Sequence, residues 1–197
     1  MRKNRSWPKA GTVVLLLLVI LFFFSLFYDD AFVLLFQGMR SPALDGFFLA
    51  FSGITYLVAI FFVVMVMILL FKRKFFPQAF IASALSVLVG YVTKIAVARP
   101  RPFVALDFSP LVVADGFSFL SGHAIFVFSL VPVFFFVFRK GVGFLWLLFA
   151  LVVAFSRLYM GVHYLSDVLA GMILGILIGR LAILIEERFV VRWKSLS

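Results

Sequence analysis

The sequence predicts an all-α, polytopic membrane protein with about six transmembrane helices, which form a single membrane-embedded domain over residues 1–197. The chain is 65% hydrophobic and only 13% charged, and its mean hydropathy is +1.24. Soluble domains are roughly half apolar and about a quarter charged. A spanning helix needs about 20 mostly apolar residues, and about six such runs use nearly the whole length. We therefore expect no separate soluble domain.

The first two predicted helices occupy the N-terminal third of the chain. Helix one runs from Gly11 to Tyr28, behind a basic flank that resembles a secretory signal. The apolar run is long and no cleavage site of small residues follows it, so we expect an uncleaved span. The mixed segment from Asp29 to Arg40 is expected at the membrane interface. Ser41 and Pro42 favour a helix start, and helix two is predicted from Ala43 to Phe71.

Prolines, glycine and short basic turns bound the other predicted helices. Helix three extends from Ala79 to Ala98, because both arginines of Arg99-Pro100-Arg101-Pro102 precede a proline and are pushed out of helical geometry. After a loop, helix four opens at Ser121-Gly122-His123 and reaches Phe138. Helix five runs from Val142 to Tyr159. Helix six is predicted from Val162 to Glu186, after Gly161 breaks the pattern.

The charge of the loops predicts the orientation, because cytoplasmic loops collect Lys and Arg. With both termini in the cytoplasm of a multi-pass cell-membrane protein, most cations fall on the inner side. These are Arg2, Lys3, Arg5, Lys9, Lys72, Arg73, Lys74, Arg139, Lys140, Arg188, Arg192 and Lys194. Arg40 lies on the other side, where four further cations also break the rule: Lys94, Arg99, Arg101 and Arg157. Those four share the extracytoplasmic side with both histidines and Asp167.

Three segments that are distant in the sequence are expected to meet at these outer helix ends. They are residues 94–102, 120–123 and 157–167. If the last segment is helical, His163 and Asp167 are four residues apart and share one face, so the carboxylate holds one ring nitrogen. The other nitrogen is then a candidate nucleophile. His163 would attack phosphorus in line, Asp167 would fix its tautomer, and His123 would protonate the leaving oxygen.

The cations of the same segments predict a phosphate-sized cradle. Lys94, Arg101 and Arg157 would surround an anion with point and forked charges. The backbone N–H groups of Ser121 and Gly122 lie at a predicted helix start and would add donors. Water that attacks the phosphohistidine would complete the hydrolysis.

These segments resemble the signature motifs of the type 2 phosphatidic acid phosphatase superfamily, a family of integral membrane lipid phosphatases. The motifs are K(x6)RP, PSGH and SR(x5)H(x3)D. Every position is matched except that Leu120 replaces the proline of the second motif. The matching residues are Lys94, Arg101, Pro102, Ser121, Gly122, His123, Ser156, Arg157, His163 and Asp167.

The resemblance implies metal-independent hydrolysis of a lipid phosphomonoester or diphosphate, such as phosphatidate or phosphatidylglycerophosphate, through a phosphohistidine and without a cofactor. Undecaprenyl diphosphate is an alternative substrate in the same class. A non-enzymatic lipid or anion transporter, which would use the cradle only for binding, is the alternative from another class. A haloperoxidase is disfavoured by the membrane embedding.

The other charged residues are assigned no chemistry. The net charge of +10 follows membrane topology, so membrane lipids and a lipid phosphate are expected as partners, and nucleic acid is not. Two histidines that are far apart and the absence of cysteine argue against a metal site. Arg99 is interpreted as a surface or lipid-headgroup contact. Arg180 is interpreted as a side chain that snorkels to the cytoplasmic side.

Overall fold

The computed structural model describes residues 9–49, 54–138 and 140–194, and every regular element in them is a helix. The predicted all-α class is therefore confirmed. Arg2, Lys3, Arg5 and Arg139, which were used to predict the orientation, lie outside the described residues. The elements are α1 (Lys9–Gly38), α2 (Pro42–Leu49), α3 (Ile54–Lys72), η1 (Arg73–Phe75), α4 (Phe76–Val97), α5 (Pro102–Ala105), α6 (Gly122–Val137), α7 (Lys140–Tyr159) and α8 (Leu165–Lys194).

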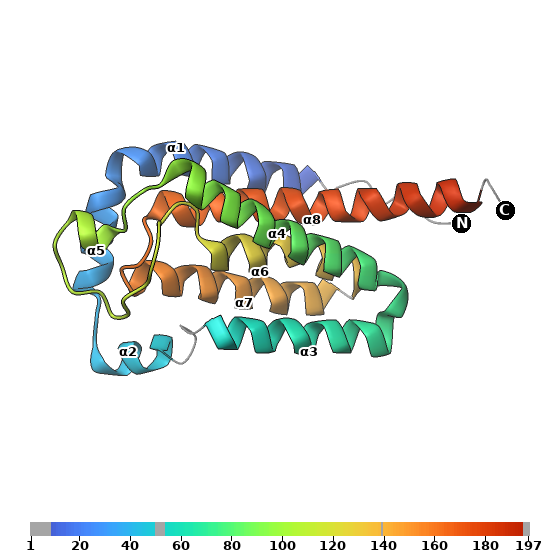
Figure 1. Cartoon of the computed structure of the whole chain (residues 1–197), viewed down its shortest axis with the longest axis horizontal. Helices are drawn as coiled ribbons and strands as arrows, with labels where there is room; N and C mark the ends of the chain where they lie inside the picture. Colours follow the sequence, from blue (N-terminus) through green and yellow to red (C-terminus); the bar gives the residue numbers. More distant parts are fainter. Residues whose placement is uncertain (1–8, 50–53, 139, 195–197) are drawn as a thin grey trace.

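The long helices form a bundle in which α6 is central. Figure 1 shows α1, α3, α4, α6, α7 and α8 running along one common direction. The helix α6 packs against α4, α7 and α8, and α1 packs against α8. The short helices α2 and α5 lie at the left end of Figure 1, with the end of α4 and the start of α8. The first residues of α1 and the last residues of α8 lie at the opposite end.

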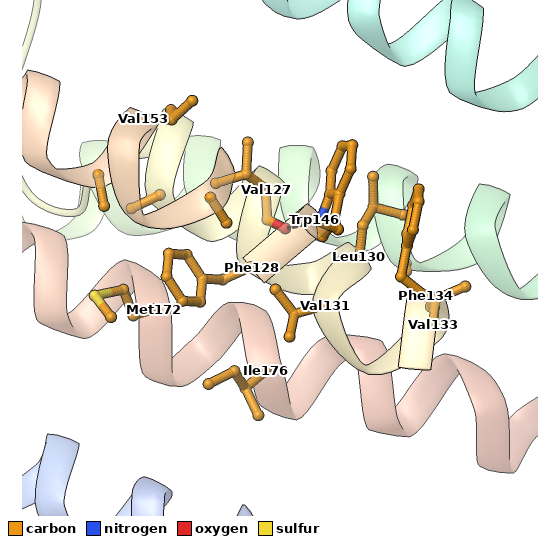
Figure 2. Packing of buried hydrophobic residues seen from close by; sticks show 14 of the residues in the cluster. Val127, Phe128, Leu130, Val131, Val133, Phe134, Trp146, Val153, Met172 and Ile176 are labelled. Carbon is orange, nitrogen blue, oxygen red and sulfur yellow. Dashed lines mark hydrogen bonds between the residues drawn. The ribbon is translucent and has the colours of Figure 1, made fainter. Parts of the chain in front are cut away.

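The core is built around α6, which is apolar on all sides, as expected for a helix that other helices surround. Figure 2 shows Phe128 of α6 beside Met172 of α8. On another side of α6, Phe134 stacks on Trp146 of α7, with the ring centroids 4.3 Å apart. The indole N–H of Trp146 donates to the carbonyl oxygen of Val127 at 2.9 Å. The buried polar group of this tryptophan is thus satisfied within the core.

Three glycines allow α8 to approach α6 closely. A Cβ atom at Gly171 would lie 2.9 Å from the carbonyl oxygen of Ser121, and one at Gly175 would lie 2.6 Å from that of Ile125. The approach at Gly179 is closer still. Small residues spaced four apart let helix backbones pack directly in membrane proteins. This stripe therefore fixes the position of α8 against α6, and both helices begin at the same end of the bundle.

The first helix is longer than predicted. The segment that was expected at the interface instead continues α1 to Gly38. The prediction was wrong because it separated the apolar run after Asp29 from helix one and took that run as too short to span. The carboxylate of Asp29 is only 5% exposed and forms an ion pair with Arg99, so this acidic residue lies within the helix.

Two other boundaries differ from the prediction. Predicted helix two corresponds to α2 and α3, and residues 50–53 between them lie outside the described residues. The last helix starts at Leu165 rather than Val162, because the carboxylate of Asp167 accepts the N–H of Tyr164 and caps the helix there. The helices α4, α6 and α7 agree with their predicted ranges to within a few residues.

Three helices in the described part of the chain are long and apolar enough to cross a membrane. They cover Gly11–Gly38, Lys140–Tyr159 and Leu165–Arg188, and Gly122–Val137 is apolar but shorter. The protein is therefore a membrane protein. About six spans were predicted, and three helices among the described residues are long and apolar enough to be spans.

Candidate active site

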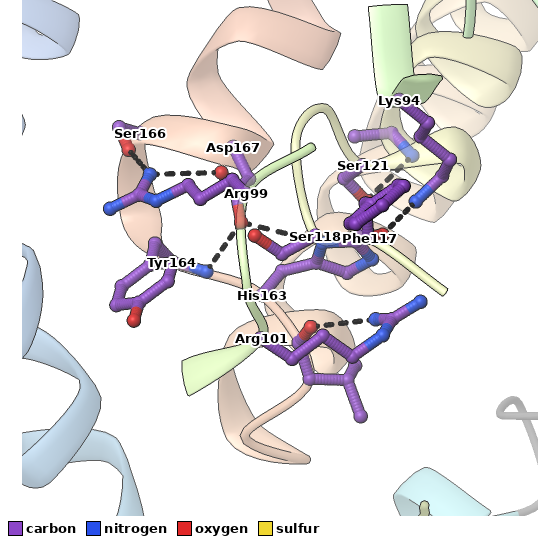
Figure 3. Close-up of polar contacts among 12 residues, drawn as sticks. Lys94, Arg99, Arg101, Phe117, Ser118, Ser121, His163, Tyr164, Ser166 and Asp167 are labelled. Atoms are coloured by element: carbon purple, nitrogen blue, oxygen red, sulfur yellow. Dashed lines mark hydrogen bonds and ion pairs between the residues drawn. The ribbon is translucent and has the colours of Figure 1, made fainter. Parts of the chain in front are cut away.

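The ends of four helices bring the three predicted segments together. Lys94 lies in the last turn of α4, Ser121 precedes α6, and Arg157 lies in the last turn of α7. The N–H of Ser121 donates to the carbonyl oxygen of Asp167 at 3.1 Å, which fastens the second segment to the third. Figure 3 shows the resulting group of polar side chains around His163.

A sharp turn after α7 carries His163. Gly161 has a φ of +73°, in the left-handed region that favours glycine. A Cβ atom there would also lie 2.7 Å from the ring of Phe108 and 2.9 Å from Nε2 of Gln37. The turn therefore depends on glycine. It leaves the His163 side chain inside the protein, with only 4% of the residue exposed.

Asp167 lies in the first turn of α8 and faces back toward this turn. Its Oδ2 accepts the N–H of Tyr164 at 2.9 Å and lies 3.6 Å from Nδ1 of His163. The two side chains do not share a helical face as predicted, because His163 precedes α8. They meet because Asp167 reaches back to cap the helix. At 3.6 Å the contact is electrostatic rather than a hydrogen bond, and Nδ1 is buried without a hydrogen-bond partner among the described residues.

The environment of His163 favours the neutral imidazole. Burial lowers the pKa of His163 to about 4. The carboxylate of Asp167 opposes this shift, and the positive charges of Lys94 and Arg101 add to it. Near pH 7 the ring is therefore uncharged. One of its nitrogen atoms then has a free lone pair, as a nucleophile requires.

Lys94 and Arg101 are held by backbone carbonyl groups. The Nζ atom of Lys94 donates to the carbonyl oxygen of Phe117 at 2.6 Å. The guanidinium of Arg101 donates at 2.7, 3.0 and 2.8 Å to the carbonyl oxygens of Asp115, Gly116 and Val162. Because these carbonyl acceptors are neutral, they orient both cations without cancelling their charge. An anion in this space would therefore still meet two positive groups.

The start of α6 supplies fewer donors than expected. The Oγ atom of Ser121 accepts the N–H of Ala124 at 3.4 Å and caps the helix. The backbone N–H of Ser121 was expected to face the phosphate, but it already donates to Asp167. The hydroxyl group of Ser121 is the donor that remains at this residue. Gly122 is the first residue of α6, and helix starts leave such N–H groups without an intrahelical partner.

Arg157 and His123 are in direct contact. Nη1 of Arg157 lies 3.2 Å from Nε2 of His123. Arginine can only donate, so Nε2 of His123 is the acceptor here. The Nε atom of Arg157 donates to Oγ of Ser156 at 3.0 Å, and only 3% of Arg157 is exposed. The site thus places a buried guanidinium beside the second histidine. Cations, one neutral imidazole and a second imidazole are groups that can carry out phosphoryl transfer.

Comparison with known proteins assigns the family. A family model described as the PAP2 superfamily matches residues 78–190 of the chain.

The chain belongs to the PAP2 superfamily.

Its relatives in this superfamily include lipid phosphatases. Phosphatidylglycerophosphatase B from Bacillus subtilis is 33% identical over 157 residues, which are 71% of this chain and 74% of that protein. An undecaprenyl-diphosphatase from Sulfolobus acidocaldarius is 32% identical over 125 residues, 61% of each protein. The crystal structure of a PAP2 type phosphatidylglycerolphosphate phosphatase from Bacillus subtilis has the same fold. It has a TM-score of 0.73 and 23% identity, and the match covers 88% of this chain and 96% of that one.

Membership of the PAP2 superfamily favours the enzyme over the transporter that the sequence left open. The two relatives named above are phosphatases of lipid phosphates or diphosphates, and a lipid A 4'-phosphatase from Porphyromonas gingivalis also matches. The chain is therefore a membrane lipid phosphatase, as predicted. The motif resemblance to this superfamily is confirmed over 78–190, a range that includes both histidines.

Sequence reasoning missed two residues beside the site. Arg99 was interpreted as a surface contact, but Nη1 of Arg99 pairs with Asp167 at 3.0 Å. Its Nη2 pairs with Asp29 of α1 at 2.9 Å, outside the region that the PAP2 family model matches. Both residues carried a signal in the sequence, because ionisable groups at membrane depth need partners. Asp29 follows an apolar run, and Arg99 is one of the cations that break the loop-charge rule.

Proposed function

We propose that this PAP2 phosphatase hydrolyses a lipid phosphomonoester or diphosphate through a phosphohistidine on His163. The observation that carries the proposal is the position of a buried, neutral imidazole beside Asp167, with Lys94 and Arg101 close enough to act on its charge. A nucleophile, its orienting carboxylate and cations for the phosphate are thereby assembled in one place.

In the first step, Nε2 of His163 attacks phosphorus in line. The N–P bond forms while the bond from phosphorus to the lipid oxygen breaks, and His123 gives its proton to that oxygen. The Asp167 carboxylate faces Nδ1 of His163 at 3.6 Å and stabilises the positive charge that the ring acquires. The lipid alcohol, or the lipid monophosphate when the substrate is a diphosphate, then leaves.

In the second step, water attacks the phosphohistidine. His123 takes a proton from the water while the N–P bond breaks, and orthophosphate is released. His123 is then protonated again and His163 is neutral, so both imidazoles are ready for another turnover. The structure without substrate has Nε2 of His123 accepting from Arg157. An arriving phosphate competes for Arg157, and its negative charge favours the protonated His123 ring.

The phosphate oxygens bind to the cations and to the start of α6. Lys94, Arg101 and Arg157 neutralise the phosphoryl group as charge builds up in the transition state. The hydroxyl group of Ser121 and the N–H of Gly122 donate to the same oxygens. None of these groups requires a metal ion or a cofactor, so the proposed reaction is metal-independent.

The names of the relatives suggest two kinds of lipid substrate. Phosphatidylglycerophosphatase B supports a glycerophospholipid phosphate such as phosphatidate or phosphatidylglycerophosphate. The second relative is an undecaprenyl-diphosphatase, which supports undecaprenyl diphosphate as the alternative. A panel of lipid phosphates and diphosphates, compared by kcat/KM, distinguishes these substrates.

We place the reaction at the extracytoplasmic face of the cell membrane, with both termini in the cytoplasm and the whole chain acting as one membrane-embedded domain. The support is the loop charge, because Lys72 ends α3, and Arg73 and Lys74 lie in η1 before α4, at the end of the bundle opposite α5. The phosphate of an outer-leaflet lipid lies at headgroup level, where it meets the cations while its tail stays in the bilayer.

Phosphate release by the purified protein tests the chemistry. We expect the wild type to release phosphate from a lipid phosphate in the presence of EDTA, and His163→Ala to lose this activity. A ³²P-labelled lipid should leave label on wild-type protein quenched at alkaline pH, where phosphohistidine is stable. Activity retained in His163→Ala, or label found on another residue, would remove His163 as the nucleophile.

A further inference from the structure

A single guanidinium joins α1 to the carboxylate beside His163. Arg99 follows α4, and its Nη1 lies 3.0 Å from Oδ1 of Asp167. Its Nη2 lies 2.9 Å from Oδ2 of Asp29, in α1. Figure 3 shows Arg99 beside Asp167 and Ser166. Both carboxylates are buried, Asp167 at 0% and Asp29 at 5% exposure, so this one cation compensates two charges inside the protein.

Asp29 also holds the start of α8. Its Oδ1 accepts the N–H of Ser166 at 2.9 Å, and the Ser166 hydroxyl donates to Oδ2. The same hydroxyl oxygen accepts from Nη1 of Arg99 at 2.7 Å. Ser166 therefore bridges the two charged groups and is itself fully buried. Because Asp167 is the next residue, the backbone that carries its carboxylate is fixed from the side of α1.

Arg99 is also held against an aromatic ring. Its Cζ lies 3.7 Å from the ring centroid of Tyr164, so the guanidinium stacks on the residue that follows His163. The plane of the guanidinium is thereby set, and with it the direction of both N–H groups that reach the carboxylates. A flexible ammonium group would fix neither direction.

These contacts decide which way the Asp167 carboxylate points. Oδ1 is taken by Arg99 and Oδ2 by the N–H of Tyr164, and only with both contacts in place does Oδ2 face Nδ1 of His163. Without Arg99 the N–H of Tyr164 still holds Oδ2, but one contact no longer fixes the rotation of the carboxylate about its last bond. The contact with His163 is already 3.6 Å long, so a small rotation is enough to lose it.

We propose that Arg99 and Asp29 are positioning residues for phosphoryl transfer: Arg99 orients the carboxylate of Asp167 toward His163, and Asp29 fixes Arg99 and the start of α8. This inference rests on the proposed function of His163 and Asp167. It extends the catalytic apparatus to α1, which lies outside the matched range 78–190.

The proposal predicts a loss in the chemical step and not in substrate binding. We expect Arg99→Gln to lower the single-turnover rate of phosphoryl transfer about 10- to 100-fold, with KM changed by less than about twofold, because misplaced catalytic groups slow chemistry to this degree. Asp29→Asn should lower the rate less, because Arg99 keeps its contact with Asp167. The control is Arg40→Gln, since Arg40 pairs with Asp45 at 3.4 Å and belongs to a different ion pair. This control should keep the wild-type rate.

The pH profile separates positioning from a general loss of folded protein. The charged and titratable groups that act on the His163 ring are Asp167, Lys94, Arg101 and His123. In Arg99→Gln the turned Asp167 carboxylate loses its contact with Nδ1 of His163, and this contact raises the pKa of the ring, so the acidic limb of kcat/KM should move to lower pH. Arg99→Lys should show the same shift and the same slow rate, because it keeps the charge but loses the fork that orients the carboxylate. Asp29→Asn should move the limb less, because Arg99 keeps its contact with Asp167.

A double-mutant cycle tests whether Asp29 acts through Arg99. Asp29→Asn should slow the wild type but have little further effect in the Arg99→Gln background. In the Arg40→Gln background its effect should be the same as in the wild type. Thermal unfolding in detergent reports the folded fraction, to which every rate is normalised.

Three results would overturn the inference. One is a wild-type single-turnover rate in Arg99→Gln. Another is a change in KM without a change in the single-turnover rate. The third is an equal slowing at every pH, with the acidic limb of kcat/KM at its wild-type position. If the wild type itself releases no phosphate from any lipid phosphate, the proposed function fails and this inference fails with it. An active wild type with an unaffected Arg99→Gln removes only the positioning role.

Discussion

The proposed chemistry depends on a histidine that is kept out of water. Only 4% of His163 is exposed, and burial lowers its pKa to about 4 from the ordinary value of about 6.5. A histidine on the surface would be partly protonated at mildly acidic pH and would lose its lone pair. The buried position therefore extends the pH range over which the proposed nucleophile is competent.

The pH dependence of the free enzyme follows from this shift. Because the folded-state pKa of His163 is lowered, the ring stays neutral at neutral pH and is protonated only as the pH falls through about 4. We expect the acidic limb of kcat/KM, corrected for the ionisation of the substrate phosphate, to lie well below pH 6.5. Measurements between about pH 3 and pH 8 in detergent check this. A limb near pH 6.5 would indicate a solvated imidazole and contradict the expectation.

The role of His123 depends on the leaving group. A lipid alcohol is a poor leaving group that needs a proton, whereas p-nitrophenolate leaves without one. We therefore expect His123→Ala to lower the rate of phosphoryl transfer from a lipid phosphate about 10²- to 10⁴-fold, and that from p-nitrophenyl phosphate much less. Equal losses for both substrates would argue that His123 binds phosphate and does not act as an acid.

At the residue scale, the motif positions were predictable and their partners were not. Spacing along the chain predicted that His163, Asp167 and the cations meet, because the proposed chemistry needs those residue types, and the structure brings them together. It did not show that the N–H of Ser121 donates to Asp167 or that Arg99 contacts Asp29, which is 70 residues away. Such contacts depend on how the helices pack, and a single sequence does not specify that packing.

At the scale of elements, the contact between α6 and α8 sets the geometry of the site. The glycines at 171, 175 and 179 bring the two backbones together, and the stripe begins at the carbonyl oxygen of Ser121. Ser121 and Asp167, at the adjacent starts of these helices, are joined by a hydrogen bond. A change in the distance between the helices would therefore be transmitted to the site.

A methyl group in this interface should be costly. We expect Gly175→Ala to destabilise the protein by about 1–3 kcal/mol, because its Cβ would lie 2.6 Å from the Ile125 carbonyl oxygen and the helices must separate. Gly90→Ala in α4 is the matched control, since its nearest atom would be a side-chain carbon of Ile125 at 3.5 Å, an ordinary contact. Thermal unfolding in detergent measures both. If Gly175→Ala is as stable as Gly90→Ala, the helices separate without loss of stability and the expectation is wrong.

The helix boundaries show which helix ends the hydrophobic pattern of the sequence predicts and which it does not. The pattern predicted α4, α6 and α7 well, because apolar runs and prolines mark their ends. It ended α1 too early, because the apolar run after Asp29 was separated from helix one and is too short to span by itself. It also began α8 too early, since Val162 is apolar and only the cap formed by Asp167 shows where the helix starts.

For the whole molecule, the long helices place the site at one end of the bundle and the beginning of α1 and end of α8 at the other. The site and the basic turn between α3 and α4 are therefore expected on opposite sides of the membrane. The sequence predicted this arrangement from loop charge alone, because the charge rule depends on composition and not on packing.

Single cysteines test the orientation, since the chain contains none. Val113 is 75% exposed in the loop before α6, and Lys74 is exposed at the opposite end. We expect a membrane-impermeant maleimide to label Val113→Cys in intact spheroplasts, and to label Lys74→Cys only after lysis. Both variants should keep phosphatase activity. The reverse labelling pattern would place the active site in the cytoplasm.

The bond between Asp29 and Ser166 also has a consequence for biosynthesis. These residues are 137 positions apart, so the acid enters the bilayer long before its serine partner is synthesised. A nascent chain that stops before α8 already holds Arg99 to pair with this carboxylate, but it lacks the N–H and the hydroxyl group of Ser166. The surroundings of Asp29 in the first helix are therefore complete only after α8 has been made and has packed against α1.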